Sequence, residues 1–182
     1  LITNILNEAE SYTSLDIIES YIEGGQDLSN LPVQPLYVAI KSLPTETVAL
    51  ALEKFSPKQR QVFLDLDLWK KDDIDPNSFS FWLETYSKCT NDEIKSEFLN
   101  STEFAMFLKA KMSFWTFDVE DPEYPDHDYY FLTEDNLLLF EFEEDYPYIA
   151  EMRQFIKDLY TEHGVENAYQ YLFKVVSEGF TS

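Results

Sequence analysis

Three prolines set the rhythm of the central part of the chain. Pro32, Pro44 and Pro57 lie 12 and 13 residues apart, and each stands at the start of a run with helical spacing of apolar residues. Proline is accommodated in the first turn of a helix, because the N–H of that turn has no intrahelical partner. Helices of about three turns are not stable alone in water. The stretch Leu31–Trp69 therefore predicts three short helices that stack as a superhelical repeat.

Capping patterns and apolar positions place these three helices. Ser56, followed three residues later by Gln59, is typical of a capping box, and Thr45 is the expected cap of the middle helix. The residues predicted to face inward are Leu36, Val38, Ile40 and Leu43 in the first helix, Val48, Leu50 or Ala51, Leu52 and Phe55 in the second, and Val62, Phe63, Leu66 and Trp69 in the third.

The stretch Leu31–Trp69 resembles the helical repeats in the cytosolic N-terminal domain of MgtE-type bacterial magnesium transporters. Those repeats share its order of Leu-Pro, helix, Leu-Pro, helix, Ser-Pro, helix, and the flagellar motor switch protein FliG has related repeats. In the transporters the acidic residues face a neighbouring domain, and the chain departs from them because it has no transmembrane span. A longer pattern, which continues through residues 127–149 to the last helices, resembles a family of uncharacterised bacterial proteins and implies no activity.

Helix signals continue on both sides of the repeat. Before it, residues 1–12 and 15–23 have helical apolar spacing, and Ser14 can cap the second segment. After it, three capping patterns open further helices, of which the last is expected to be long. These patterns begin at Asp75-Pro76, at Thr90 with Glu93, and at Ser101 or Thr102; the buried faces that follow the first and the last are Phe79, Trp82, Leu83 and Tyr86, and Phe104, Phe107, Leu108, Met112 and Trp115.

The character of the chain changes at residue 117. No Lys or Arg occurs between Met112 and Met152, and residues 118–128 contain two prolines without a helical period, which predicts a loop. Residues 129–132 and 137–142 are apolar and aromatic runs around a polar turn, typical of a β-hairpin. A lone hairpin is marginal in water, so it must pack on helices or use its edge for self-association.

The C-terminal part predicts a helical hairpin. Asp145 is the expected cap of a helix that holds Pro147 in its first turn and ends at Gly164, and a last helix runs from Val165 to a stop at Gly179. The predicted fold is mostly α, a short-helix superhelical repeat with one inserted β-hairpin and a C-terminal helical hairpin. Residues 1–117 form the repeat region, and residues 118–182 add the acidic loop, the hairpin and the helical pair, packed as one domain with it.

The charge restricts the class of partner. The chain has 35 Asp and Glu against 13 Lys and Arg, a net charge of −22. This excess disfavours nucleic acid and anionic membranes, which both require basic side chains, and favours a protein partner with a basic surface. A hydrophobic content of 45% argues against disorder. One cysteine and the lack of a signal peptide predict a cytoplasmic protein.

The sequence contains no pattern typical of an enzyme. Four glycines are not arranged as a phosphate-binding loop, and GxSxG, HExxH and CxxC motifs are absent. Cys89 stands beside Lys88, which can lower a thiol pKa, but a passive thiol is the simpler interpretation. His163 precedes Gly164 at a helix C-terminus, where a cation is favoured. The chain is therefore predicted not to be an enzyme.

The acidic loop offers one alternative. Hard cations such as Mg²⁺ and Ca²⁺ take several oxygen ligands, and the loop has many on one short segment. The competing interpretation is a solvated acidic surface. The sequence thus predicts a non-enzymatic protein-interaction or scaffold module or, as the alternative, an acidic regulatory domain that responds to Mg²⁺ or Ca²⁺. The candidate metal ligands are Asp118, Glu120, Asp121, Glu123, Asp126 and Asp128.

Overall fold

A computed structural model describes residues 15–144 and 146–181 of the chain. These residues are mostly helical, as predicted, and they divide into two compact units, the first up to Lys95 and the second from Ser96 onward. The change of composition at residue 117, which suggested the predicted division, lies inside the second unit. The helix predicted at residues 1–12 and the Ser14 cap lie outside the described residues.

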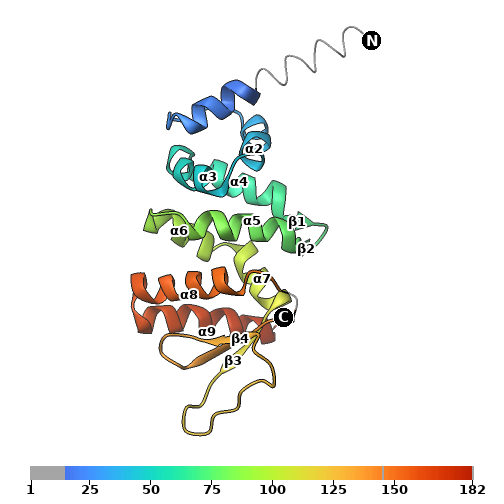
Figure 1. The fold of residues 1–182 in the computed structure, drawn as a ribbon, viewed down its shortest axis with the longest axis vertical. Coiled ribbons are helices and arrows are strands. Elements are labelled where there is room, and N and C mark those ends of the chain that lie inside the picture. Colours follow the sequence, from blue (N-terminus) through green and yellow to red (C-terminus); the bar gives the residue numbers. More distant parts are fainter. Residues whose placement is uncertain (1–14, 145, 182) are drawn as a thin grey trace. The chain divides into compact units, whose positions relative to one another are not determined.

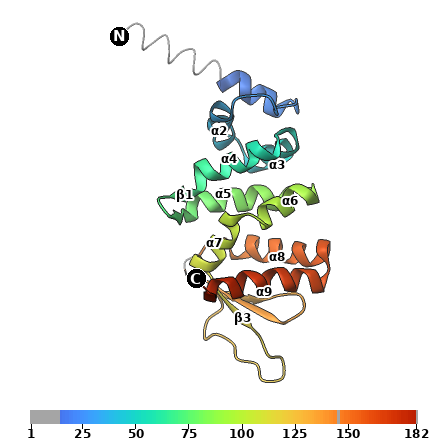
Figure 2. The same ribbon diagram turned by 180° about the vertical axis from the view of Figure 1, so that it is seen from behind.

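The first unit contains the predicted succession of short helices. Residues 15–23 are helical and are followed by two glycines, as predicted. The elements that follow are α2 (Val33–Lys41), α3 (Thr45–Ala51), the 3₁₀ helix η1 (Leu52–Lys54), α4 (Pro57–Leu68) and α5 (Pro76–Ser87). Figures 1 and 2 show α2 to α5 as consecutive short helices.

Proline marks the start of each helix of the repeat. Pro32 and Pro44 are the N-caps of α2 and α3, and Pro57 is the first residue of α4. The capping box of Ser56 and Gln59 is confirmed. The Thr45 cap is wrong, because the extended backbone of Pro44 already serves as N-cap and no side chain caps α3.

The predicted core of the repeat is confirmed in most positions. The ring of Phe63 packs 5.0 Å from Phe55 and 6.3 Å from Trp82. The predictions for Val38 and Leu66 are wrong, because these residues are exposed by 50% and 46%. Of the alternatives Leu50 and Ala51, Ala51 is the buried one, whereas Leu50 is 76% exposed. Residues one or two positions from the exposed ones lie in the core instead, so the predicted buried faces of the helices are rotated slightly from the observed ones. These residues are Ala39, Ala49, Leu64 and Leu68.

The end of the first unit contains one element that was not predicted. β1 (Trp69–Lys70) and β2 (Asp73–Ile74) form a two-residue antiparallel ladder around Lys71, whose φ is 60°. Asp75 and Pro76 open α5 as predicted, and the aromatic face of α5 is buried. The next helix is α6 (Asp92–Leu99). Its first turn is capped by Asn91, which accepts from the Ile94 N–H at 3.1 Å, rather than by Thr90.

The second unit contains a three-stranded sheet where one hairpin was predicted. Ser101 caps α7 (Thr102–Lys111), as predicted, but α7 does not continue to Trp115. Residues Ser113–Thr116 instead form β3, because they find a partner strand far along the chain. The predicted hairpin is confirmed as β4 (Tyr130–Leu132) and β5 (Leu138–Glu141), and the antiparallel order is β3-β5-β4.

Two long helices follow the sheet. α8 (Ile149–His163) and α9 (Val165–Thr181) are joined at Gly164, whose φ of 82° suits the abrupt turn predicted there. The predicted stop at Gly179 is wrong, since α9 continues to Thr181; a glycine inside a helix costs only about 1 kcal/mol. The predicted Asp145 cap lies outside the described residues. Within the described part, no helix is long and apolar enough to span a membrane.

Candidate binding site at the open edge of the sheet

The outer edge of β4 has main-chain groups without a partner strand. Phe131 is paired with Phe140 of β5. The Phe142 N–H donates to the Tyr129 carbonyl, and the Thr133 N–H donates to the Leu138 carbonyl. In an antiparallel ladder, these bonds direct the N–H and C=O of odd-numbered β4 residues toward β5. The N–H and C=O of Tyr130 and Leu132 therefore point away from the sheet, and no described residue pairs with them.

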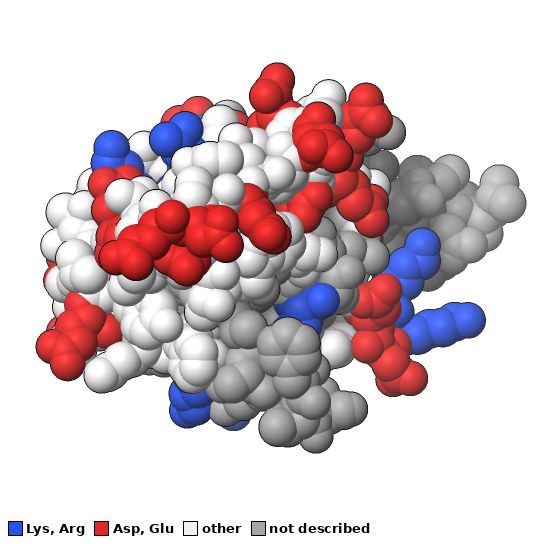
Figure 3. All heavy atoms as spheres, turned by 90° about the horizontal axis from the view of Figure 1, so that it is seen from below, with Lys and Arg blue, Asp and Glu red and all other residues white. Residues whose placement is uncertain are grey.

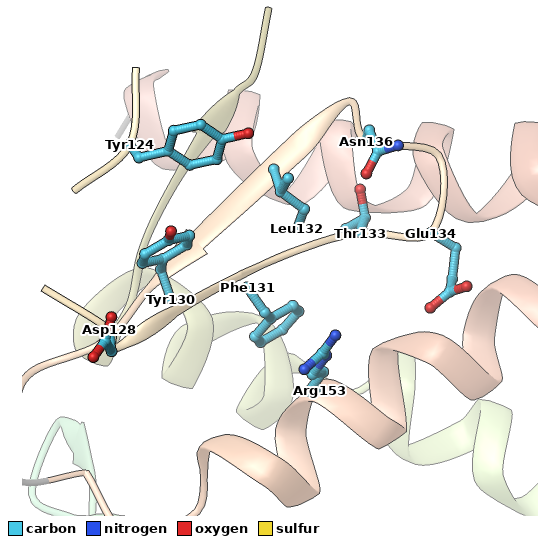
Figure 4. Close-up of a pocket in the computed structure, with 9 residues that line it drawn as sticks. All are labelled: Tyr124, Asp128, Tyr130, Phe131, Leu132, Thr133, Glu134, Asn136 and Arg153. Atoms are coloured by element: carbon cyan, nitrogen blue, oxygen red, sulfur yellow. The ribbon is translucent and has the colours of Figure 1, made fainter. Parts of the chain in front are cut away.

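A cavity of about 520 Å³ follows this edge. Four consecutive residues, Tyr130 to Thr133, contribute to its lining. Successive strand residues point to opposite faces, so a cavity lined by all four must run beside the strand rather than over one face. Figure 4 shows the strand passing through the site, with the other labelled side chains around it; these are Tyr124, Asp128, Glu134, Asn136 and Arg153.

The hairpin turn beyond β4 is held by side-chain hydrogen bonds. Thr133 Oγ1 donates to Asp135 Oδ1 at 2.6 Å, and the Leu137 N–H donates to the same oxygen at 3.0 Å. Asn136 adopts a φ of 60°, a conformation that asparagine tolerates better than most residues. These hydrogen bonds therefore fix the turn that follows the edge of β4.

The acidic loop between β3 and β4 folds back along the sheet through aromatic contacts. The ring of Tyr124 packs 5.3 Å from Phe117 at the end of β3 and 6.0 Å from Tyr130 in β4. Phe117 is buried, whereas Tyr124 is 55% exposed. Such ring pairs contribute about 0.5–1.5 kcal/mol each beyond area burial. They hold the loop so that Tyr124 forms one wall of the cavity.

His127 fixes the second end of the loop. Its Nε2 lies 2.6 Å from Glu141 Oε1 on β5, and its Nδ1 accepts from the Tyr129 N–H at 3.0 Å. Because Nδ1 is an acceptor, we assign the proton of the neutral ring to Nε2, where it donates to the carboxylate. The pair connects the end of the loop to the central strand, three residues before β4 begins at Tyr130.

The surroundings of the cavity are strongly acidic. Asp128 and Glu134 are exposed and stand at the two ends of β4. Arg153 of α8 is the basic residue of the lining, and Figure 4 shows it below the strand, on the side of Phe131. Figure 3 shows many Asp and Glu side chains across the face seen from below, with Lys and Arg mainly toward its margins. The potential at this edge favours positive ligands.

The six predicted metal ligands are all exposed. Asp118 Oδ1 accepts from the Glu120 N–H at 2.9 Å, a local turn contact, and Asp128 lines the cavity. Among the residues that the structure describes, no group of three or more His, Cys, Asp or Glu is placed to hold a metal ion. The structure thus does not bring the six together, and cation binding by the loop stays a prediction.

The sequence analysis did not identify the residues that form this site, apart from Asp128. Tyr130 and Leu132 were assigned to a strand, but which of their groups face outward depends on the register with β5. Arg153 had one available signal, since it is the first basic residue after the long window without Lys or Arg. Elsewhere, Cys89 is buried and burial raises the pKa of its thiol, as expected for an unactivated cysteine.

The sequence pattern of a family of unknown function, DUF6178, matches residues 4–180. The chain belongs to this family. The match covers nearly the whole chain, both units included, and agrees with the resemblance to an uncharacterised family. It does not show the resemblance of Leu31–Trp69 to the MgtE and FliG repeats. No curated protein and no solved structure matches this DUF6178 chain.

Proposed function

We propose that this chain is a non-enzymatic protein-interaction module that binds an extended, basic segment of a partner protein along the outer edge of β4. The observation that carries the proposal is the open edge itself, because the outward residues Tyr130 and Leu132 line the cavity. Free N–H and C=O groups on a strand edge accept one further strand, and side-chain pockets beside them select its sequence.

Charge complementarity supports a basic occupant. Asp128 and Glu134 flank the edge, and the net charge of the chain is −22. Opposite charge speeds encounter and excludes wrong partners, more than it adds affinity. A second copy of the chain would bring identical carboxylates together, so we expect the edge to remain unpaired in the absence of a partner.

The rigidity of the edge supports binding as well. The Thr133–Asp135 turn and the His127–Glu141 contact hold both ends of β4 before any ligand arrives. An edge that is already ordered loses little conformational entropy on binding. The free, buried Cys89 is compatible with a reducing cytoplasm, which is where we expect the module to work.

A peptide titration tests the proposal. The probe is a fluorescein-labelled peptide of seven residues that alternates Lys with Val, and its counterpart has Glu in place of Lys. We expect the Lys peptide to bind with a Kd on the order of 10⁻⁵ M in fluorescence anisotropy, about −7 kcal/mol, and to weaken with added salt. Equal binding of the Glu peptide would contradict the role of charge.

Two proline variants test the role of the strand edge. Leu132→Pro removes an outward N–H and places a ring in the path of the added strand, whereas edge positions tolerate proline within the sheet. Thr116→Pro is the matched control, because Thr116 faces outward on the opposite edge, at β3. We expect at least a tenfold loss of affinity for the first variant and none for the second, with both folded by circular dichroism.

Three results would overturn the proposal. Unchanged binding by Leu132→Pro, or an equal loss in Thr116→Pro, would exclude the β4 edge. Sedimentation equilibrium that shows a dimer lost in Leu132→Pro would assign the edge to a second copy instead. If Leu132→Pro does not fold, Asp128→Asn with Glu134→Gln replaces it, and unchanged affinity at low salt then counts against the proposal.

A further inference from the structure

Arg153 is a basic side chain that has no partner among the residues that the structure describes. Some basic side chains of the chain pair with carboxylates; Lys41 Nζ lies 2.7 Å from Asp67, and Lys88 Nζ lies 2.6 Å from Glu46. Arg153 lines the cavity, is exposed, and makes no ion pair or hydrogen bond with another described residue. With 35 acidic residues in the chain, a guanidinium that pairs with none of the described ones is available to a ligand.

The two sides of β4 present different chemistry to an added strand. Figure 4 shows Tyr124, Tyr130 and Leu132 on one side of the strand, and Phe131 with Arg153 on the other. Consecutive side chains of an added strand point alternately to these two sides. Tyrosine rings near Asp128 suit a Lys or Arg side chain, while a guanidinium suits a carboxylate in a bidentate pair.

The shortness of the edge favours the end of a chain. Only Tyr130 and Leu132 point outward, and the hairpin turn follows directly, so an added strand has few main-chain bonds to make. A chain end carries a carboxylate whatever its sequence. It therefore supplies an anion to Arg153 without an acidic residue in a segment that the surface selects for positive charge.

We infer that Arg153 binds the C-terminal carboxylate of the partner, so that the occupant of the β4 edge is a basic C-terminal tail. This inference rests on the proposed strand addition. The tail lies along β4, its basic side chains meet the Tyr124, Tyr130 and Asp128 side, and its terminal carboxylate pairs with the guanidinium of Arg153.

A double-mutant cycle tests the pairing. The Lys-Val peptide is compared as its free C-terminal acid and its C-terminal amide, against the wild type and Arg153→Gln. We expect the amide to bind the wild type about tenfold more weakly, which corresponds to about 1.4 kcal/mol, and both forms to bind Arg153→Gln within about twofold of each other. Glutamine keeps the helical preference of an exposed position.

Lys157→Gln is the matched control, because Lys157 is an exposed cation one turn further along α8 that does not line the cavity. It should retain the tenfold difference between acid and amide. Equal binding of the two peptides to the wild type would overturn the role of Arg153 and leave strand addition standing. The same difference in Arg153→Gln would also overturn it. If neither peptide binds the wild type, the proposed function fails together with this inference.

Discussion

The two units differ in how their buried polar groups are satisfied. In the first unit, the carboxylate of Asp67 accepts from Tyr37 Oη at 2.6 Å, Lys41 Nζ at 2.7 Å and Trp82 Nε1 at 2.7 Å. One side chain thus joins α2, α4 and α5. In the second unit, buried side-chain atoms that lack a hydrogen-bond partner among the described residues include Asp135 Oδ2, Glu151 Oε2 and Tyr160 Oη.

These buried polar atoms, which lack a partner among the described residues, belong to elements near the candidate site. A buried polar atom without a partner costs about 1–3 kcal/mol, so native proteins keep few of them. Asp135 and Tyr160 belong to the hairpin turn and to α8, the elements that shape the cavity. Proteins tend to depart from full satisfaction near functional sites. The polar connections of the first unit stabilise packing, whereas those of the second are incomplete beside the candidate site.

The largest effect is expected at Asp67. Asp67→Ala leaves the Tyr37 hydroxyl, the Trp82 indole N–H and the Lys41 ammonium without their acceptor. The carboxylate is only 7% exposed, so water replaces it poorly. We expect a loss of about 3–5 kcal/mol in the free energy of unfolding, measured by urea titration. Lys41→Met, which removes the more exposed partner, should cost clearly less. A loss below about 1 kcal/mol for Asp67→Ala would mean that the three contacts of the Asp67 carboxylate do not stabilise the first unit.

The same chemical change in each unit sharpens the comparison. Tyr37→Phe removes a hydroxyl that donates to Asp67, and we expect it to cost about 1–2 kcal/mol. Tyr160→Phe removes a hydroxyl that is buried beside Thr133 and Asp135 but makes no hydrogen bond of ordinary geometry with them, and we expect it to cost clearly less than Tyr37→Phe. Urea unfolding of both variants measures the difference. Equal losses would show that Tyr160 has a partner in solution.

The pH dependence of Tyr37 follows from the same contact. Burial, together with the hydrogen bond to Asp67 and its charge, raises the pKa of Tyr37 from 10.0 to about 12. The folded state then holds this proton more tightly than the unfolded state does. The contribution is therefore complete below pH 10 and is lost as the pH rises toward about 12. The stability gap between wild type and Tyr37→Phe should narrow over this window, and a constant gap would contradict the assignment.

The local elements of this fold could be predicted because their signals lie within a few residues. The Ser56 capping box, the Asp75-Pro76 helix start and the Gly164 turn each depend on one or two neighbours. The buried faces of the helices were predicted less accurately. On short helices a shift of one position moves the predicted buried face, which is why Val38 was predicted to face inward although it is 50% exposed.

The candidate site could not be predicted because it depends on pairing between distant residues. The sequence of β3 is typical of the end of an amphipathic helix. Only its pairing with β5, about 25 residues later in the chain, makes it a strand. The outward direction of the Leu132 N–H is fixed by that same register. Arg153 reaches the cavity because α8 packs beside the hairpin turn. The three contacts of the Asp67 carboxylate likewise depend on the packing of α2, α4 and α5.

Helix caps should not distinguish the two units. Ser56 accepts from the Gln59 N–H at 3.1 Å in the first unit, and Ser101 accepts from the Phe104 N–H at 3.1 Å in the second. We expect Ser56→Ala and Ser101→Ala each to cost about 1 kcal/mol in urea unfolding. Similar losses would confine the contrast between the units to their tertiary polar contacts, whereas a much smaller loss at Ser101 would extend it to local structure.

The smallest effect is expected from divalent cations, which address the alternative function directly. The measurement is thermal unfolding with millimolar Mg²⁺ or Ca²⁺ at matched ionic strength, for the wild type and for Asp126→Asn with Asp128→Asn. A ligand present at about a hundred times its Kd would add about 2.7 kcal/mol. Because the six loop carboxylates are exposed and are not grouped as a metal site among the described residues, we expect no shift beyond the salt control. A shift that the double variant abolishes would make the loop a cation site. The charge of the loop would then be neutralised by a metal ion rather than by a basic partner.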